Sequence, residues 1–219
     1  MMILQKKFWL DIMVPALGAT LQMTLITTVI SAILGTLVAV LMIVTNKGGM
    51  LQNRFVYGTL GFIVNAIRSF PFLILIVFII PFTKMIVGTS VGVKGAIVPL
   101  VIAATAFIAK IIENALQEVD PSLIQSMKSF GLTDTQVIFK VMFSEAMPAI
   151  VSGIILAAVS ILNCTAMAGT VGAGGVGAIA ILYGYQSFRE DVMYVTVLIL
   201  ILMVQGIQML GDYVYRKMK

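Results

Sequence analysis

The chain has 219 residues, of which 60% are hydrophobic and 11% are charged, with a mean hydropathy of +1.10 and a net charge of +5. A soluble domain carries about 25% charged residues, so this composition excludes a soluble globular protein, and it excludes a disordered one as well. The absence of His and the presence of a single Cys, Cys164, exclude histidine-based catalysis, Cys–His nucleophile pairs, zinc fingers and disulfides. We therefore expect an all-α integral membrane protein that is not an enzyme and uses neither cofactor nor metal.

Five apolar segments are long enough to cross a membrane, since a spanning helix needs about 20 mostly apolar residues. In chain order, the predicted spans are residues 18–44, 55–80, 94–112, 149–168 and 192–211. The uncharged stretch after Pro148 is too long for one helix, and the glycine-rich sequence GTVGAGGVG (residues 169–177) divides it. We expect the residues up to 188 to form a re-entrant or surface segment, because residues 176–188 are too few for a sixth span.

The order of these segments predicts three parts: an N-terminal segment (residues 1–14), a transmembrane domain (15–211) and a C-terminal tail (212–219). Lys6 and Lys7 precede an apolar stretch, as in a signal peptide. That stretch is too long for a signal peptide and has no clear cleavage site, so we expect a retained first span.

The basic residues indicate orientation, because they are spread along the chain beside apolar runs and are not clustered as in nucleic-acid-binding proteins. Five spans place the two termini on opposite sides of the membrane. If the C-terminus is cytoplasmic, eight basic residues lie on that side and five lie outside, with Arg68 inside the second span. Cytoplasmic loops carry an excess of Lys and Arg, so we predict an external N-terminus and a cytoplasmic C-terminus.

The longest polar segment, residues 113–147, lies between the third and fourth spans and holds five of the nine acidic residues. Asp120 and Pro121 form a favourable helix start, and Gly131 a helix end. Thr133 or Asp134 can cap a second helix, which we expect to stop near Pro148. The apolar residues of the first helix form one stripe: Leu123, Ile124, Met127 and Phe130. This helix–glycine–helix elbow (residues 120–148) is either a loop on the membrane surface or a docking element for a soluble partner.

The sequence LIQSMKSFGLTDTQVIFKVMFSEAMPAI (residues 123–150) resembles the cytoplasmic loop of ABC importer membrane subunits. The Glu-Ala-Ala of that family's motif falls on Gln125, Ser126 and Met127, its glycine on Gly131, and its Leu-Pro on Phe143 and Ser144. The resemblance implies a short coupling helix that fits a groove in an ATP-binding subunit. The joint would be formed by Gln125, Ser126, Met127, Phe130 and Gly131. Because Gln125 replaces the motif's Glu, shape and apolar contact must supply more of this coupling than a salt bridge.

Two further stretches, RSFPFLILIVFIIPFTKMIVGTSVG (residues 68–92) and TAMAGTVGAGGVGAIAILYGYQSF (residues 165–188), resemble the membrane subunits of methionine importers. The resemblance implies the type I ABC importer permease fold with five spans, in a bacterial cell membrane. It also implies transport of D- and L-methionine by a homodimer with two copies of an ATP-binding subunit and an extracytoplasmic methionine-binding lipoprotein. A permease for another amino acid, a channel without partners and an integral membrane lipid-modifying enzyme remain as alternatives. The absence of His and the scattered acids count against the enzyme.

Three groups of residues within the spans are candidates for function. Ser160, Asn163 and Thr165 form a polar patch in the fourth span, and Asn163 and Met167 lie four residues apart on one helix face. Ser160, Asn163 and Met167 are predicted to line the translocation pathway, with Met167 part of the gate and with contacts between helices as the alternative. Arg68 is a charge inside a predicted span; we expect it to be a structural residue near the headgroups, with a functional intramembrane charge as the alternative. Glycines at 172, 174 and 177 match GxGxxG, but a helix-length apolar run precedes them in place of a strand, so we interpret them as a tight turn and close packing.

Overall fold

The computed structural model describes residues 6–218, and within that range the chain forms helices and no β-strand. The helices are α1 (Lys6–Phe8), α2 (Val14–Thr45), α3 (Arg54–Ser69), α4 (Phe72–Phe78), α5 (Ile80–Val87), α6 (Gly92–Gln117), α7 (Pro121–Ser129), α8 (Asp134–Gln136), α9 (Phe143–Gly169), α10 (Val176–Ile179) and α11 (Glu190–Met218). Three π-helical segments, Trp9–Met13, Val137–Met142 and Ala180–Gln186, join α1 to α2, α8 to α9 and extend α10. Residues 1–5 and 219, at the ends of the predicted flanking segments, lie outside the described part.

Among residues 6–218, four continuous helical stretches are long and apolar enough to cross a membrane: Lys6–Thr45, Gly92–Gln117, Asp134–Gly169 and Glu190–Lys217. The fifth predicted span, residues 55–80, is not one helix, because α3 and α4 meet at an angle of 107°. Pro71 causes the break, since a proline disfavours helical backbone in the residue before it, and Phe70 is extended at φ −74° and ψ 131°. The described residues thus hold four unbroken candidate spans, and α3 with α4 forms either a fifth, broken span or a re-entrant loop.

The helix ends also differ from the expectations at Pro148. The second helix of the elbow does not stop there but continues through a π-helical segment into α9, so residues 134–169 form one helical stretch. A proline inside a helix removes one hydrogen bond and its ring crowds the carbonyl four residues earlier, so packing must hold the helix together at Pro148. Ala146 and Ile150, on either side of it, are buried in the core and hold the helix together. At the chain's ends, residues 6–14 and 212–218 continue the first and last helices.

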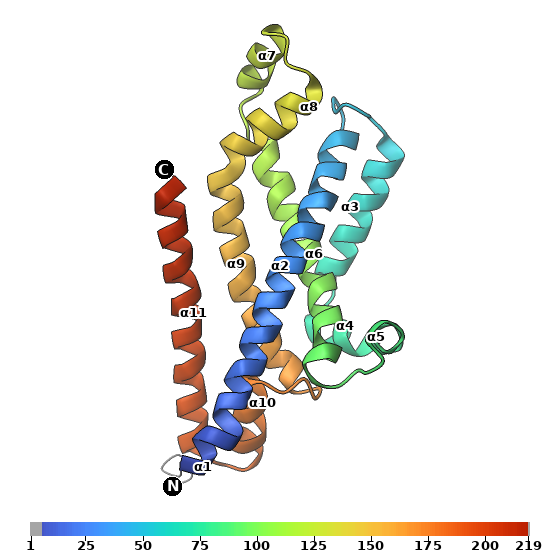
Figure 1. The fold of residues 1–219 in the computed structure, drawn as a ribbon. Helices are drawn as coiled ribbons and strands as arrows, with labels where there is room; N and C mark the ends of the chain where they lie inside the picture. Colours follow the sequence, from blue (N-terminus) through green and yellow to red (C-terminus); the bar gives the residue numbers. More distant parts are fainter. Residues whose placement is uncertain (1–5, 219) are drawn as a thin grey trace.

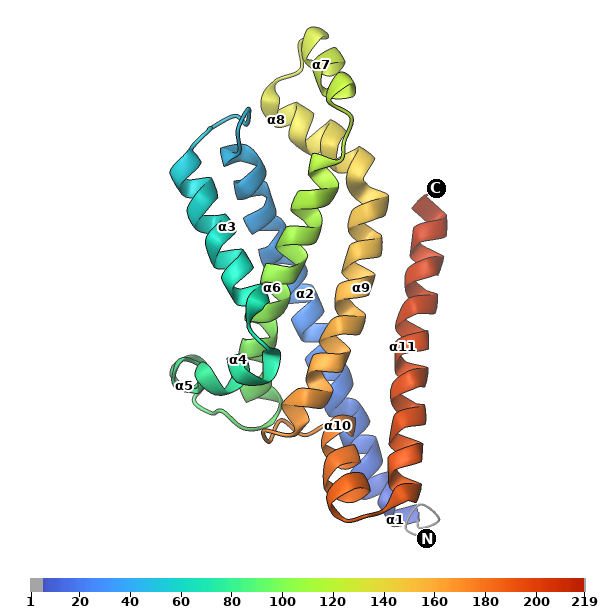
Figure 2. The same cartoon turned by 180° about the vertical axis from the view of Figure 1, so that it is seen from behind.

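The molecule is an elongated bundle in which α2, α6 and α9 are central, α3 lies along one side and α11 along the other (Figures 1 and 2). The elbow occupies one end of the bundle, here called the elbow end, and the chain's start lies at the opposite end. The largest apolar core is at the elbow end, where residues such as Ile43 of α2, Ile112 of α6 and Ile150 of α9 meet. This core fixes the elbow to the spans.

The glycine-rich segment between α9 and α10 turns the chain back against α2. Gly172, Gly174 and Gly175 have positive φ angles of 92°, 79° and 86°. The Thr20 hydroxyl of α2 accepts a hydrogen bond from the backbone N–H of Val176 at 2.9 Å. A Cβ at Gly175 would lie 2.7 Å from that hydroxyl oxygen. The glycines therefore provide a turn and close packing.

Close packing of α9 on α10 predicts a large effect for Gly169→Ala. A Cβ at Gly169 would lie 2.6 Å from the backbone nitrogen of Ala178, which cannot move aside as a side chain can. Overpacking of this kind costs about 1–3 kcal/mol, so we expect a lower melting temperature for the purified protein in detergent. Gly18→Ala is the matched control, since nothing lies within 4 Å of its Cβ position. Equal melting temperatures for the two variants would contradict this packing.

Candidate coupling elbow and translocation face

Local capping defines the elbow. The Asp120 carboxylate accepts the backbone N–H of Ser122 at 2.8 Å, which starts α7 and lowers the pKa of Asp120. Gly131, at φ +87°, ends α7 in the left-handed conformation that favours glycine. Thr133 starts the second helix in a capping box, in which its hydroxyl accepts from the backbone N–H of Gln136 and the Gln136 side chain accepts from the backbone N–H of Thr133. The predicted helix starts and the glycine turn are confirmed, with Thr133 as the cap.

The apolar stripe of α7 is divided between two directions. Leu123, Ile124 and Met127 are half-buried and pack on the elbow-end core. Phe130 points away, with 78% of its surface exposed. Three residues of the predicted stripe thus pack inside the molecule, because α7 folds back over the helix that follows it, and Phe130 alone is left exposed. The outward face of α7 is mostly polar, with Gln125 and Ser126 exposed.

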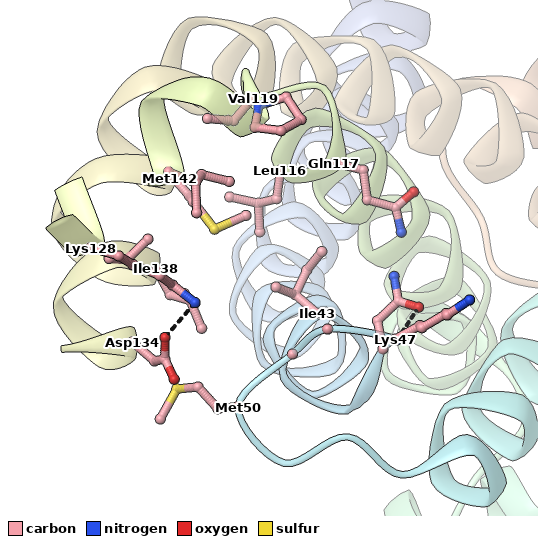
Figure 3. A pocket seen from close by; sticks show the side chains of 16 residues that line it. Ile43, Lys47, Met50, Leu116, Gln117, Val119, Lys128, Asp134, Ile138 and Met142 are labelled. Carbon is pink, nitrogen blue, oxygen red and sulfur yellow. Dashed lines mark hydrogen bonds and ion pairs between the residues drawn. The ribbon is translucent and has the colours of Figure 1, made fainter. Parts of the chain in front are cut away.

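A cavity of about 210 Å³ lies under the elbow, between α7, the α2–α3 loop and the helix that begins at Asp134 (Figure 3). Lys128 and Asp134 form an ion pair at 2.7 Å across the glycine turn, and both side chains are about half exposed. An exposed ion pair of this kind adds little to the stability of the fold. The hydroxyl of Thr135 contacts the sulfur of Met50 at 3.8 Å, which links the elbow to the α2–α3 loop.

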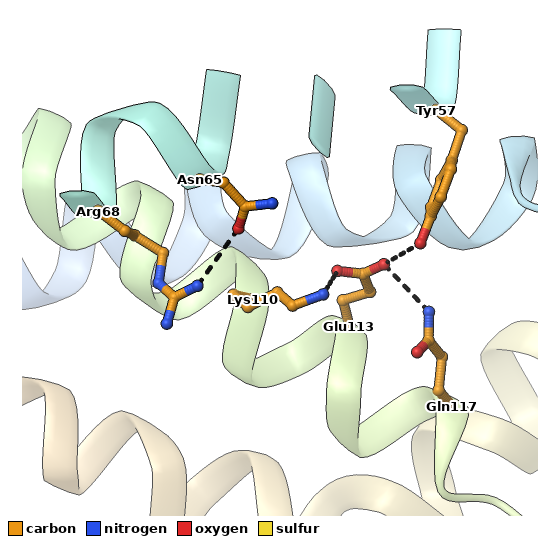
Figure 4. A network of polar contacts seen from close by, with 6 residues as sticks. All are labelled: Tyr57, Asn65, Arg68, Lys110, Glu113 and Gln117. Carbon is orange, nitrogen blue, oxygen red and sulfur yellow. Dashed lines mark hydrogen bonds and ion pairs between the residues drawn. The ribbon is translucent and has the colours of Figure 1, made fainter. Parts of the chain in front are cut away.

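A polar network around the buried Glu113 ties α3 to α6 just before the elbow (Figure 4). Glu113 is fully buried. Its carboxylate accepts from the Tyr57 hydroxyl at 2.9 Å, from the Lys110 ammonium at 2.8 Å and from the Gln117 amide at 3.0 Å. The sequence interpretation placed Glu113 in the polar loop and missed this network. The spacing of Lys110, Glu113 and Gln117 on one helix face was the available signal, whereas nothing in the sequence pointed to Tyr57.

The predicted pathway residues lie on one side of α9. Asn163 and Met167 are exposed, and Ser160 is partly exposed. With Leu156, which is also exposed, they follow each other at helical spacing and form what we call the exposed face of α9. Because Asn163 and Met167 are exposed in one copy of the chain, their contacts must come from lipid, water, substrate or another chain.

Arg68 lies near the end of α3, just before the break at Pro71. It is exposed, and its guanidinium donates to the side-chain oxygen of Asn65 at a long 3.4 Å (Figure 4). Arg68 also lines a cavity of about 270 Å³ together with Ser160 and Cys164 of α9. The fold thus brings Arg68 and Ser160, 92 positions apart in the chain, to one cavity, which neither Asn163 nor Met167 lines.

Comparison with known proteins decides the family. A sequence model described as "Binding-protein-dependent transport system inner membrane component" matches residues 35–219. The chain belongs to this family. As a member of the binding-protein-dependent family, it is a permease component of an ABC importer, with the all-α type I permease fold.

The similarity of this chain to named relatives covers most of its length. It is 44% identical to the "Probable D-methionine transport system permease protein MetI" of Vibrio cholerae over 94% of this chain and 92% of the relative. It is 42% identical to the "Methionine import system permease protein MetP" of Bacillus subtilis over 80% of this chain and 78% of the relative. A solved structure titled "Inward facing conformations of the MetNI methionine ABC transporter" matches with a TM-score of 0.93 and 38% identity, covering 98% of this chain and all of the other.

Proposed function

We propose that the chain is the membrane-spanning permease subunit of an ATP-driven importer that carries D- and L-methionine into a bacterial cell. The observation that carries this proposal is the whole-chain similarity to the structure from the MetNI methionine ABC transporter, at 38% identity and a TM-score of 0.93. The names of the Vibrio cholerae and Bacillus subtilis relatives support methionine as the substrate. Transport is the whole role of this chain, and ATP hydrolysis occurs on a separate subunit.

The elbow end is cytoplasmic and the N-terminus is external. Described basic residues at the elbow end are Lys47, Arg54, Lys110, Lys128, Lys140, Arg216 and Lys217, against Lys6, Lys7, Lys84, Lys94 and Arg189 at the other end. This excess of positive charge supports the orientation. The transmembrane domain, residues 15–211, has one elbow that docks on an ATP-binding subunit, and the opposite end receives the extracytoplasmic methionine-binding lipoprotein.

Two copies of the chain form the permease, with two copies of the ATP-binding subunit. The exposed face of α9 lines the pathway, with Ser160, Asn163 and Met167 at or near its gate. In this arrangement Asn163 and Met167, which are exposed in a single copy of the chain, gain contacts within the assembly.

The elbow's connections support a coupling mechanism. At one end, α7 follows α6 after three residues, and at the other, the helix that begins at Asp134 continues directly into α9. A displacement of α7 by the ATP-binding subunit therefore moves two central spans together. Gln125, Ser126 and Phe130 are the exposed contacts of α7 for that subunit, Met127 holds α7 to the core, and Gly131 sets the turn.

Purification of the tagged chain from its native membrane tests the assembly. We expect an ATP-hydrolysing protein to co-purify in equal amount. In a separate uptake assay with the reconstituted complex, we expect added L- or D-methionine to compete with labelled methionine. Purification of the chain without an ATPase would favour a channel or a lipid-modifying enzyme. Competition by another amino acid alone would keep the importer and change the substrate.

Cysteine scanning tests the pathway. In a Cys164→Ala background, we expect Ser160→Cys, Asn163→Cys and Met167→Cys to react with a membrane-impermeant thiol reagent in at least one nucleotide state. Ala168→Cys is the matched control, because Ala168 on the same helix is fully buried and should not react. If none of the three pathway positions reacts in any nucleotide state, the exposed face of α9 does not line an aqueous path.

A further inference from the structure

We propose that the cavity between α3, α6 and α9 binds the transported amino acid, with Arg68 holding its carboxylate; this rests on the proposed function. The cavity has a volume of about 270 Å³. Ligand pockets for drug-sized molecules measure about 300–1,000 Å³, so a space slightly below that range suits a single amino acid.

Arg68 is a cation without an acidic partner. Among residues 6–218, no carboxylate lies within 4.0 Å of its guanidinium, and its hydrogen bond to Asn65 is long at 3.4 Å. Arg68 is 14 residues from the start of α3 at Arg54, which places it about 21 Å along the helix at a rise of 1.5 Å per residue. An arginine within the hydrocarbon of a bilayer is unfavourable by about 2.5–3.5 kcal/mol or more. A carboxylate from a ligand would pair with it through two parallel hydrogen bonds.

The rest of the wall fits an apolar side chain that contains sulfur. Phe72 and Phe107 supply aromatic rings, and Cys164 supplies a thiol. A thioether makes favourable contacts with aromatic rings and fills irregular apolar space. The Ser160 hydroxyl makes no hydrogen bond with any other described residue, so it is available to a polar group of the ligand.

The position of the cavity connects it with the pathway. Ser160 lies both on the exposed face of α9 and in the cavity wall. An amino acid that moves along that face therefore passes a residue that lines the same cavity as Arg68. Arg68 would then select for a carboxylate, and the apolar wall for the side chain.

Cys164 provides the test, because it is the only cysteine of the chain and lines the cavity. The probe is alkylation of Cys164 by N-ethylmaleimide, followed by the mass of this chain, in the purified permease–ATPase complex without binding protein. At about ten times its Kd, L-methionine should slow alkylation about tenfold. The deaminated analogue 4-methylthiobutanoate should also protect, whereas 3-methylthiopropylamine, which lacks the carboxylate, should not.

Arg68→Met should abolish the protection by methionine, and Arg54→Met, the same change at the start of α3, should retain it. A complex that imports methionine but shows no protection of Cys164, or equal protection by the amine, overturns this site and leaves the proposed function standing. A complex that imports only another amino acid overturns methionine as the substrate, whatever the protection. A methionine analogue with a diazirine in its side chain gives a second measurement, and cross-links that all lie outside the cavity overturn the site.

Discussion

Replacing Phe130 by aspartate is expected to lower ATP-driven uptake by about tenfold or more, because a loss of about 1.4 kcal/mol at an interface is a factor of ten and buried aromatic anchors often exceed it. Phe130 is the one outward-pointing member of the apolar stripe, with 78% of its surface exposed. The substitution should therefore leave the fold of the elbow unchanged. Uptake into proteoliposomes and the melting temperature of the purified complex separate the two effects.

Phe55→Asp is the matched control for this experiment. Phe55 is 81% exposed and lies at the elbow end, but it belongs to α3 and not to the elbow. If the two variants lose uptake equally, Phe130 is not a contact for the ATP-binding subunit. Serine substitutions at Leu123, Ile124 and Met127 would instead test the stability of the elbow, since these residues pack on the elbow-end core.

Replacing Glu113 by leucine is expected to cause the largest loss of stability. The substitution leaves the Lys110 ammonium, the Tyr57 hydroxyl and the Gln117 amide without their acceptor. Removal of one partner from a buried ion pair costs about 3–5 kcal/mol. The effect should lie near the lower end of that range, because the Lys110 side chain is 29% exposed and can reach water.

Thermal unfolding of the purified complex measures this loss. Glu118→Leu is the control, since Glu118 lies five residues further along the chain and is exposed. Tyr57→Phe removes only one donor and should have a smaller effect than Glu113→Leu. A melting temperature for Glu113→Leu equal to that of Glu118→Leu would show that the network does not stabilise the contact between α3 and α6.

The spans and the elbow could be predicted because their signals are local. Runs of apolar residues mark the spans, and Asp120-Pro121, Gly131 and Thr133 mark helix ends through contacts with the nearest backbone groups. The break at Pro71 has an equally local cause, but composition alone could not give the 107° between α3 and α4. That angle depends on what α4 packs against.

The site depends on contacts between distant segments, and there the sequence was less informative. The helical stripe from Leu123 to Phe130 was visible, but the direction in which each residue points depends on how α7 folds back on the core. Glu113 looked like a loop residue because its partner Tyr57 lies 56 positions away. Arg68 and Ser160 likewise line one cavity only because α3 packs on α6 and α6 on α9, which the sequence alone does not show.

The central claim is that this chain provides the path for methionine while a separate subunit supplies energy from ATP. Uptake of radiolabelled L-methionine into proteoliposomes tests it most directly, with the chain, its co-purifying ATPase and its binding protein reconstituted together. We predict accumulation that requires ATP and the binding protein and is strongly reduced by Phe130→Asp. Accumulation that proceeds without ATP, or an assembly that hydrolyses ATP yet moves no methionine, would contradict the account.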